Sequence, residues 1–274
     1  MIRPRRSVLF IPGSNARALA KARGLDCDVV VLDLEDAVAP EAKTHARLVV
    51  CEAVAARAFA NKEVAVRINP LSSEYGRADL EAVIKAGPDA IILPKVRGAA
   101  EIGEARSPIK LWAMIETPRA ILHLDAIAAA GVDCLILGAN DLTKEMRAQA
   151  MPGREHLWAA MSLIVMHARA HGIDAIDATF NAIHDAEGFA ASCTLGRGFG
   201  FDGKTLIHPG QIEAANRIFG PGVEDVEDAR RILAAFAQNP GKSVLGLDGR
   251  MVERLHAEEA SRLLALAEAI KSRC

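Results

Sequence analysis

Eight short apolar segments rich in β-branched residues recur along the chain, separated by stretches of helical periodicity. Apolar residues within each segment are consecutive, which is typical of strands buried on both faces of a parallel sheet. Eight strand-then-helix repeats favour an α/β fold of the (β/α)8 TIM-barrel type, with an open doubly wound sheet as the alternative. The segments are SVLFIP (7–12), DVVVLDLE (28–35), EVAVRIN (63–69), AIILPK (90–95), KLWAMIE (110–116), CLILGAND (134–141), IDAIDAT (173–179) and KTLIHP (204–209).

The chain is longer than the barrel alone requires. We predict the barrel for residues 1–220 and a C-terminal extension for residues 221–274. The extension is expected to contain a helix over 223–239, a hairpin with Asp248-Gly249 as its tight turn, and a helix over 255–270. Such an extension would cap its own barrel or reach a neighbouring subunit.

Composition excludes several classes of function. The formal net charge is −2, which leaves no basic excess for nucleic acid. The five cysteines form no Cys-x-x-Cys pair, which fits a reducing cytoplasm. The first apolar segment ends at Pro12-Gly13, far too early for a signal peptide or a membrane span. We therefore expect a cytoplasmic protein with no nucleic-acid or membrane partner.

Two carboxylates follow neighbouring predicted strands, Glu116 after the fifth and Asp141 after the sixth. Neighbouring strands lie about 4.8 Å apart, so both side chains are expected to reach one ion. Magnesium commonly takes one or two protein carboxylates, whereas zinc would require a histidine or cysteine at ligand spacing. The alternative is that each residue only caps the helix that follows it.

Arg67 closes the third predicted strand and offers a planar fork for a substrate carboxylate. The alternative is a structural salt bridge to Glu35 or Asp36 at the end of the second strand. Both interpretations can hold together, because an acid that orients Arg67 also supports binding.

The segment from Gly198 to Gly203 spells the dinucleotide pattern GxGxxG. It precedes a predicted strand, however, whereas a dinucleotide site needs the turn that follows one. We interpret the segment as a loop.

Several segments in order resemble the citrate lyase β-subunit and CoA-ester lyase family: RRSVLFIPGS, VVVLDLEDAVAPEAK, VRINPLSSEYGRADLEAV, LPK, IETP, LGANDL and GFDGKTLIHPGQI. The resemblance implies a magnesium-dependent barrel enzyme that cleaves or forms a carbon–carbon bond in a 3-hydroxyacyl thioester such as citryl-, malyl- or citramalyl-CoA. It places the metal on Glu116 and Asp141, and it makes Arg67 and Glu116 the substrate-binding residues. The implied reaction is retro-Claisen cleavage to a 2-oxoacid and an acyl thioester.

Two positions depart from the family pattern. Many members have glutamate where this chain has Asn140, directly before Asp141. The C-terminal pattern Gly-Lys-Met-Val/Ile-Asp is replaced by Gly-Arg-Met-Val-Glu, which ends at Glu253. The family assigns that aspartate the acid/base role, so Glu253 is the expected base, with Asp36 and Glu35 as alternatives.

The sequence is also compatible with two other functions. One is a pyruvate-type hydroxy-oxoacid aldolase that uses no CoA, and the other is a weakly active, metabolite-binding subunit of a lyase complex. The expected partners are a small 2-oxoacid, a CoA thioester and further copies of the chain, in a homo-oligomer such as a trimer or hexamer.

Overall fold

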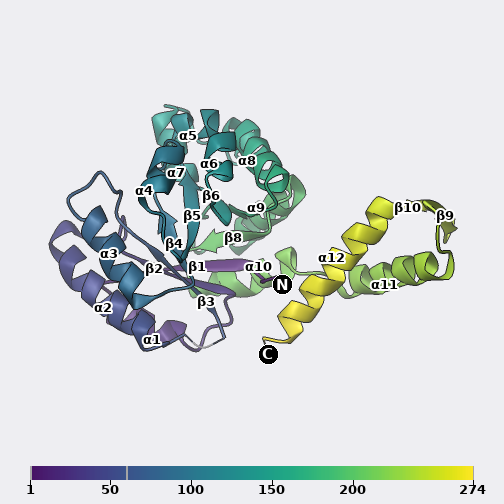
Figure 1. Ribbon diagram of the computed structural model, residues 1–274, viewed down its shortest axis with the longest axis horizontal. Helices are drawn as coiled ribbons and strands as arrows, with labels where there is room; N and C mark the ends of the chain where they lie inside the picture. The colour runs from purple at the N-terminus through teal and green to yellow at the C-terminus, as the bar shows by residue number, and fades with distance from the viewer. Residues whose placement is uncertain (1, 60, 274) are drawn as a thin grey trace. The chain divides into compact units, whose positions relative to one another are not determined.

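The computed structural model describes residues 2–59 and 61–273, and its strands confirm the predicted (β/α)8 barrel (Figure 1). Within the described chain, eight parallel strands follow one another in order, and β8 pairs with β1 to close the barrel. The strands are β1 (Ser7–Pro12), β2 (Val29–Asp33), β3 (Glu63–Arg67), β4 (Ala90–Leu93), β5 (Lys110–Ile115), β6 (Cys134–Leu137), β7 (Asp174–Asp177) and β8 (Gly203–Leu206).

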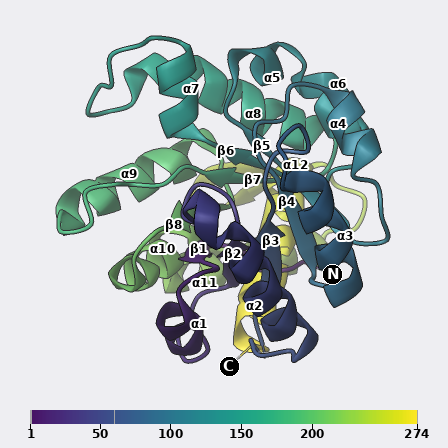
Figure 2. The same cartoon turned by 90° about the vertical axis from the view of Figure 1, so that its left-hand side faces the viewer.

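Helices surround the strands of the barrel (Figure 2). They are α1 (Ala16–Ala22), α2 (Lys43–Ala55), α3 (Gly76–Ala86), α4 (Ala99–Glu104), α5 (Pro118–Leu122), α6 (Leu124–Ala129), α7 (Ala139–Glu145), α8 (Trp158–Ala170), α9 (Ala186–Phe199) and α10 (Ile212–Phe219), with 3-10 turns at Pro40–Ala42, Glu155–Leu157 and Pro209–Gln211. None of the described helices combines the length and apolar character needed to cross a bilayer.

The barrel interior is aliphatic and completely buried, which explains the consecutive apolar runs of the sequence. In β2 the three valines from Val29 to Val31 are all fully buried, because one face meets the barrel axis and the other meets the helix layer. The central apolar cluster consists mainly of aliphatic side chains with one tryptophan: Val8, Val29, Val31, Ala65, Ala90, Ile92, Trp112, Met114, Cys134, Ile136 and Ile176.

At the amino ends of the strands, Arg5 closes the barrel. Its guanidinium donates to Glu63 at 2.8 and 2.7 Å and to Asp174 at 2.8 Å, and it lies 4.5 Å from the centre of the Trp112 ring. The charge of Arg5 is therefore paired within the fold.

Between the barrel and α9, Asp177 is the partner of two cations. Its carboxylate accepts from Lys204 at 2.8 Å and from Arg154 at 2.6 and 3.0 Å, and the side chains of Asp177 and Lys204 are fully buried. Arg154 precedes α8, so this cluster fastens the segment between α7 and α8 to the last two strands.

The GxGxxG segment is not a continuous loop, so that interpretation is wrong for its first half. Gly198 lies in the last turn of α9, and Gly200 ends that helix in a left-handed conformation with φ of +97°. Gly203 opens β8, where a Cβ atom would lie 1.8 Å from the carbonyl oxygen of Arg5. The glycines serve a helix end and a close backbone approach, neither of which involves a dinucleotide.

The described chain divides into two compact units. One is Arg5–Asn216, which contains the barrel, and the other runs from Arg217 onward and includes residues 2–4. The second unit contains α11 (Val223–Gln238), the predicted hairpin of β9 (Val244–Leu247) and β10 (Arg250–Glu253), and α12 (Arg254–Lys271). Asp248 and Gly249 form the turn with φ of +50° and +77°, as the Asp-Gly pair predicts. The unit has an apolar cluster of its own, which includes Ile232, Leu245 and Val252.

Candidate active site

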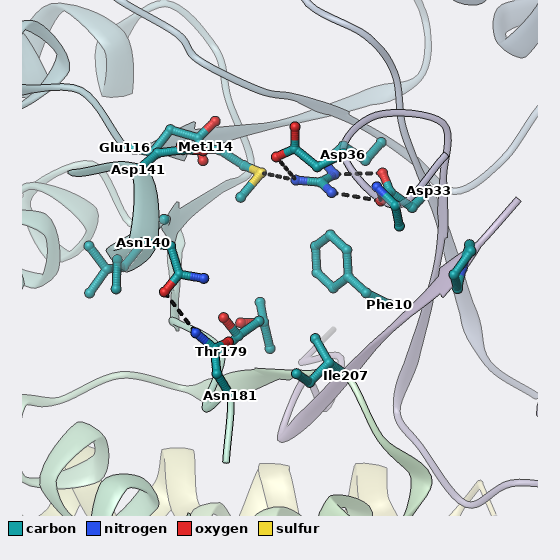
Figure 3. A pocket seen from close by; sticks show the side chains of 17 residues that line it. Phe10, Asp33, Asp36, Met114, Glu116, Asn140, Asp141, Thr179, Asn181 and Ile207 are labelled. Atoms are coloured by element: carbon teal, nitrogen blue, oxygen red, sulfur yellow. Dashed lines mark hydrogen bonds and ion pairs between the residues drawn. The ribbon is translucent and has the colours of Figure 1, made fainter. Parts of the chain in front are cut away.

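A cavity of about 420 Å3 opens at the carboxyl ends of the barrel strands (Figure 3). Its wall is formed by residues at or just beyond the ends of β1, β2, β3, β5, β6, β7 and β8. Among the described residues that line it, the ionisable ones are four carboxylates and one guanidinium: Asp33, Asp36, Glu116, Asp141 and Arg67. In α/β barrels this end carries the ligand-binding groups.

Arg67 and Asp33 are the terminal residues of β3 and β2 and lie opposite each other in the strand register. Their side chains form a two-pronged ion pair, with both N–O distances 2.6 Å. Glu35 lies 2.8 Å from the Arg67 Nη1 atom, and the Phe10 ring lies 5.1 Å from the guanidinium carbon. Burial disfavours the charge of Arg67, but Asp33 and Glu35 outweigh that effect and hold its pKa above the ordinary value.

Arg67 therefore forms a structural salt bridge, as the alternative interpretation expected. Its main partner is Asp33, whereas the sequence had suggested Glu35 or Asp36. The register of two strands ending in opposite charges is the signal that points to this pair. Asp33 uses the edge formed by Nε and Nη2, so a substrate carboxylate would have to share Nη1 with Glu35. Substrate binding by Arg67 stays a prediction.

The turn after β2 folds around the Asp33 carboxylate, which accepts the backbone N–H of Glu35 at 3.0 Å and of Ala37 at 3.1 Å. From the other side, the Lys43 ammonium donates to the carbonyl oxygens of Leu34 and Glu35. The Asp33 carboxylate therefore positions both the Arg67 side chain and the backbone of the acidic turn.

Lys95 connects the acidic turn to Glu116, although the sequence interpretation gave it no role of its own. Its ammonium lies 2.7 Å from Glu35 and 3.4 Å from Asp36, while its backbone N–H donates to Glu116 at 2.7 Å. Its φ of +53° lies in the left-handed region, which costs a non-glycine residue roughly 1–2 kcal/mol. Strain of this kind persists only where the surroundings enforce it.

Glu116 is almost completely buried at the end of β5. Gly138, just past β6, leaves room for it, because a Cβ atom there would lie 2.3 Å from the Glu116 Oε2 atom. The helix-cap alternative does not apply to Glu116, since Thr117 caps α5 by accepting the backbone N–H of Ala120. Asp141 lies in the first turn of α7, whose N-cap position is Gly138.

Burial raises the pKa of Glu116 to about 7, and the nearby Glu35 and Asp141 carboxylates add to the effect while the Lys95 N–H opposes it. A buried carboxylate surrounded by like charges is a favourable partner for a divalent cation, which would displace the proton. In the described chain, no cluster of three or more His, Cys, Asp or Glu side chains could hold a metal by itself. Glu116 and Asp141 thus fit magnesium, which completes its shell with water and substrate oxygens.

The remaining predicted residues fall in different places. Glu35 is buried between Arg67 and Lys95, and Asp36 lines the cavity. Glu253 belongs to the second unit, where it ends β10 and occupies the N-cap position of α12, and its backbone N–H donates to His256 at 2.9 Å. Its role in proton transfer stays a prediction.

The wall between β6 and β7 carries two amides that the sequence interpretation also left without a role. Asn181 Nδ2 donates to Asn140 Oδ1 at 3.0 Å, and both residues line the cavity (Figure 3). The Glu-to-Asn departure at position 140 was the only sequence signal for this pair.

The protein is a closed (β/α)8 barrel with an acidic cavity at the carboxyl ends of its strands. This arrangement is typical of α/β-barrel proteins, in which small ligands bind at that end. Residues 6–209 match the family model described as HpcH/HpaI aldolase/citrate lyase. The chain belongs to this family, and the resemblance inferred from the motifs is confirmed.

Individual relatives agree with this assignment. A Cereibacter sphaeroides protein named (3S)-malyl-CoA thioesterase is 45% identical over 273 residues, which are 97% of this chain and 96% of the relative. The citrate lyase subunit beta of Haemophilus influenzae is 36% identical over 282 residues, with 96% of this chain and 97% of the relative covered. A solved structure of the CitE protein of Mycobacterium tuberculosis, in complex with magnesium, acetoacetate and coenzyme A, is 30% identical with a TM-score of 0.82 and covers 96% of this chain and 97% of that one.

The raised pKa of Glu116 predicts that magnesium binding depends on pH. The metal needs the ionised carboxylate, so protons compete with it below about pH 7, and each pH unit lower should weaken magnesium affinity about tenfold. Calorimetric titration with glyoxylate present, below and above pH 7, measures this. Glu116→Gln and Asp141→Asn should abolish binding, whereas Glu145→Gln on the exposed side of α7 should not. Wild-type affinity in the first two variants would remove these residues from the metal site.

Arg67→Lys should weaken 2-oxoacid binding, because an ammonium cannot reproduce the two-pronged contact with Asp33 and also face a substrate acid. Loss of one charged hydrogen bond corresponds to roughly ten- to a hundredfold in affinity. Glyoxylate or pyruvate affinity is measured by calorimetry in magnesium, with circular dichroism to check folding. If the folded variant binds both acids as tightly as wild type, Arg67 is only the structural partner of the acidic turn.

Proposed function

We propose that this protein is a magnesium-dependent carbon–carbon lyase acting on a 3-hydroxyacyl-CoA-type thioester such as citryl-, malyl- or citramalyl-CoA. The observation that carries the proposal is one barrel-end cavity that contains a buried arginine and the Glu116 and Asp141 carboxylates. Family membership supports it, as do relatives named for citrate and malyl-CoA. The products would be a 2-oxoacid and an acyl thioester.

Held by Glu116 and Asp141, magnesium would supply Lewis acidity and a template for the hydroxyl and adjacent carboxylate oxygens of the substrate. Arg67 would neutralise the substrate carboxylate. The backbone N–H of Lys95 would hold Glu116 in place.

The reaction needs a base that removes the hydroxyl proton, after which the carbon–carbon bond breaks and its electrons pass to the thioester as an enolate that is then protonated. Asp36 lines the cavity. Partial burial acts to raise its pKa, but Arg67, Glu35 and Lys95 together hold that pKa below the ordinary value, which makes Asp36 a weak base. Burial raises the pKa of Glu35, but Arg67 and Lys95 already hold its two oxygens at 2.8 and 2.7 Å. These constraints favour Glu253, the position that the family pattern assigns to the base.

Thioester hydrolysis is the second candidate function, because the relative at 45% identity is named a thioesterase. Water would then attack the thioester carbonyl, and the carbon–carbon bond would stay intact. A CoA-independent hydroxy-oxoacid aldolase and a weakly active, metabolite-binding subunit of a lyase complex are further alternatives with the same cavity. We also propose a cytoplasmic location and a homo-oligomer, such as a trimer or a hexamer.

Turnover assays on the purified full-length chain distinguish these functions. With malyl-CoA, a lyase releases glyoxylate and acetyl-CoA without a free thiol, whereas a hydrolase releases malate and the free CoA thiol. An aldolase releases pyruvate from a CoA-free hydroxy-oxoacid. We expect lyase products that disappear when a chelator removes magnesium. Free thiol without oxoacid would replace the lyase proposal by hydrolysis, and no product from any substrate would leave only binding.

The proposed base leads to a prediction for Glu253. Glu253→Gln should lower lyase turnover by roughly a hundredfold or more, as expected for a lost general base, while magnesium and oxoacid affinities stay unchanged. Glu253→Asp tests whether the shorter family side chain works here, and Glu259→Gln on the exposed side of α12 is the matched control. Full lyase activity in Glu253→Gln would return the role to Asp36 or Glu35.

A further inference from the structure

The side-chain amides of Asn140 and Asn181 in the cavity wall are joined by a hydrogen bond, and the backbone on either side of that bond is anchored. Asn140 lies in the first turn of α7, and the backbone carbonyl oxygen of Asn181 accepts the backbone N–H of Ile183 at 3.0 Å. The neighbouring Phe180 carbonyl oxygen accepts from Gln211 at 3.0 Å. Because Asn181 Nδ2 donates to Asn140 Oδ1, the Asn140 amide presents its nitrogen on the opposite side.

The Asn140 amide nitrogen has no hydrogen-bond partner among the described residues, and in Figure 3 the side chain lies between the carboxylates and the Thr179 side of the cavity. The hydroxyl of Thr205, which also lines the cavity, is already used within the fold, because it donates to the backbone carbonyl oxygen of Asp177 at 3.0 Å. Asn140 therefore offers an uncharged donor to a cavity that is also lined by the Glu116 and Asp141 carboxylates, which are acceptors.

We propose that the Asn140 amide nitrogen donates a hydrogen bond to the thioester carbonyl oxygen of the substrate, and that Asn181 is the positioning residue that keeps this donor turned toward the cavity. The assignment deepens the proposed function and rests on it. A 3-hydroxyacyl thioester brings a carboxylate, a hydroxyl and a thioester carbonyl, and Arg67 and the metal-binding carboxylates account for the first two.

The thioester oxygen gains negative charge in either candidate reaction. In cleavage, a base takes the hydroxyl proton and the electrons of the breaking carbon–carbon bond move into the thioester, forming an enolate that is then protonated at carbon. In hydrolysis, a water oxygen bonds to the carbonyl carbon, the C=O pair moves to oxygen, and the thiolate leaves with a proton when the pair returns. A preorganised donor at that oxygen stabilises both charged states.

A purely structural role for the pair is the competing explanation. Both side chains are exposed, and an exposed neutral hydrogen bond contributes only about 1 kcal/mol or less to stability. A glutamate at position 140, common in the family pattern, would replace the donor by a negatively charged acceptor and repel the developing oxyanion. We therefore treat residue 140 as a determinant of how the thioester is handled.

Asn140→Asp tests the proposal, because it keeps the size of the side chain and exchanges the donor for an acceptor. We expect kcat on the cleaved thioester to fall about a hundredfold or more, with KM, magnesium affinity and oxoacid affinity little changed. Asn181→Asp should also lower kcat, because the Asn140 amide would turn its nitrogen toward the new carboxylate. Lys144→Gln, on the exposed side of α7, makes the same charge change outside the cavity and should match wild type.

A spectroscopic arm does not depend on turnover. Acetyl-CoA labelled with 13C at the thioester carbonyl should show a downfield shift of that carbon when it binds wild-type protein with magnesium, and the shift should be lost in Asn140→Asp and reduced in Asn181→Asp. Unchanged kcat together with an unchanged carbonyl shift in Asn140→Asp overturns the proposal, as does a wild-type protein that produces no shift. Failure of the proposed function is seen separately, as absence of wild-type turnover on every thioester.

Discussion

The site depends on one buried ion pair, that between Asp33 and Arg67. Both residues end their strands at the same level of the barrel, so the register of β2 and β3 brings opposite charges together without any loop. Removing either partner would break a buried ion pair, which typically costs about 3–5 kcal/mol, although Glu35 would still face Arg67. The same carboxylate also accepts two backbone N–H groups of the acidic turn, so the arginine, the turn and Glu35 are positioned together.

The negative charge of the cavity is nevertheless only partly neutralised. Arg67 acts on Glu116 and Lys95 acts on Asp141, but among the described residues neither carboxylate forms an ion pair like that between Asp33 and Arg67. The barrel tolerates this by keeping Glu116 partly protonated near neutral pH, as its raised pKa indicates. A divalent ion would replace that proton and relieve the repulsion among the carboxylates. Binding of such an ion would therefore be linked to the ionisation of Glu116.

Much of this architecture could be predicted from the sequence. Each barrel strand is buried on both faces, so it appears in the sequence as a continuous run of apolar residues. Glu116 and Asp141 could be predicted as a pair since they follow adjacent strands. Lys95 could not, because its contribution comes from a left-handed backbone and an N–H group that no side-chain pattern reveals. The space that Gly138 leaves for Glu116 and the link between Asn140 and Asn181 depend in the same way on distances across the barrel mouth. The GxGxxG segment shows that a sequence pattern can also mislead. Its glycines lie at the end of α9 and the start of β8 and do not form one continuous loop.

Lys95 contacts the site through both its backbone amide and its side-chain ammonium. Its amide holds Glu116, and every residue except proline supplies that amide, whereas its ammonium holds Glu35 and Asp36 and belongs to lysine alone. A glycine at this position would keep the amide and adopt the left-handed backbone without strain, yet it would release the acidic turn. Substitutions at residue 95 can therefore change the contacts of Glu35 and Asp36 while Glu116 keeps its backbone hydrogen bond.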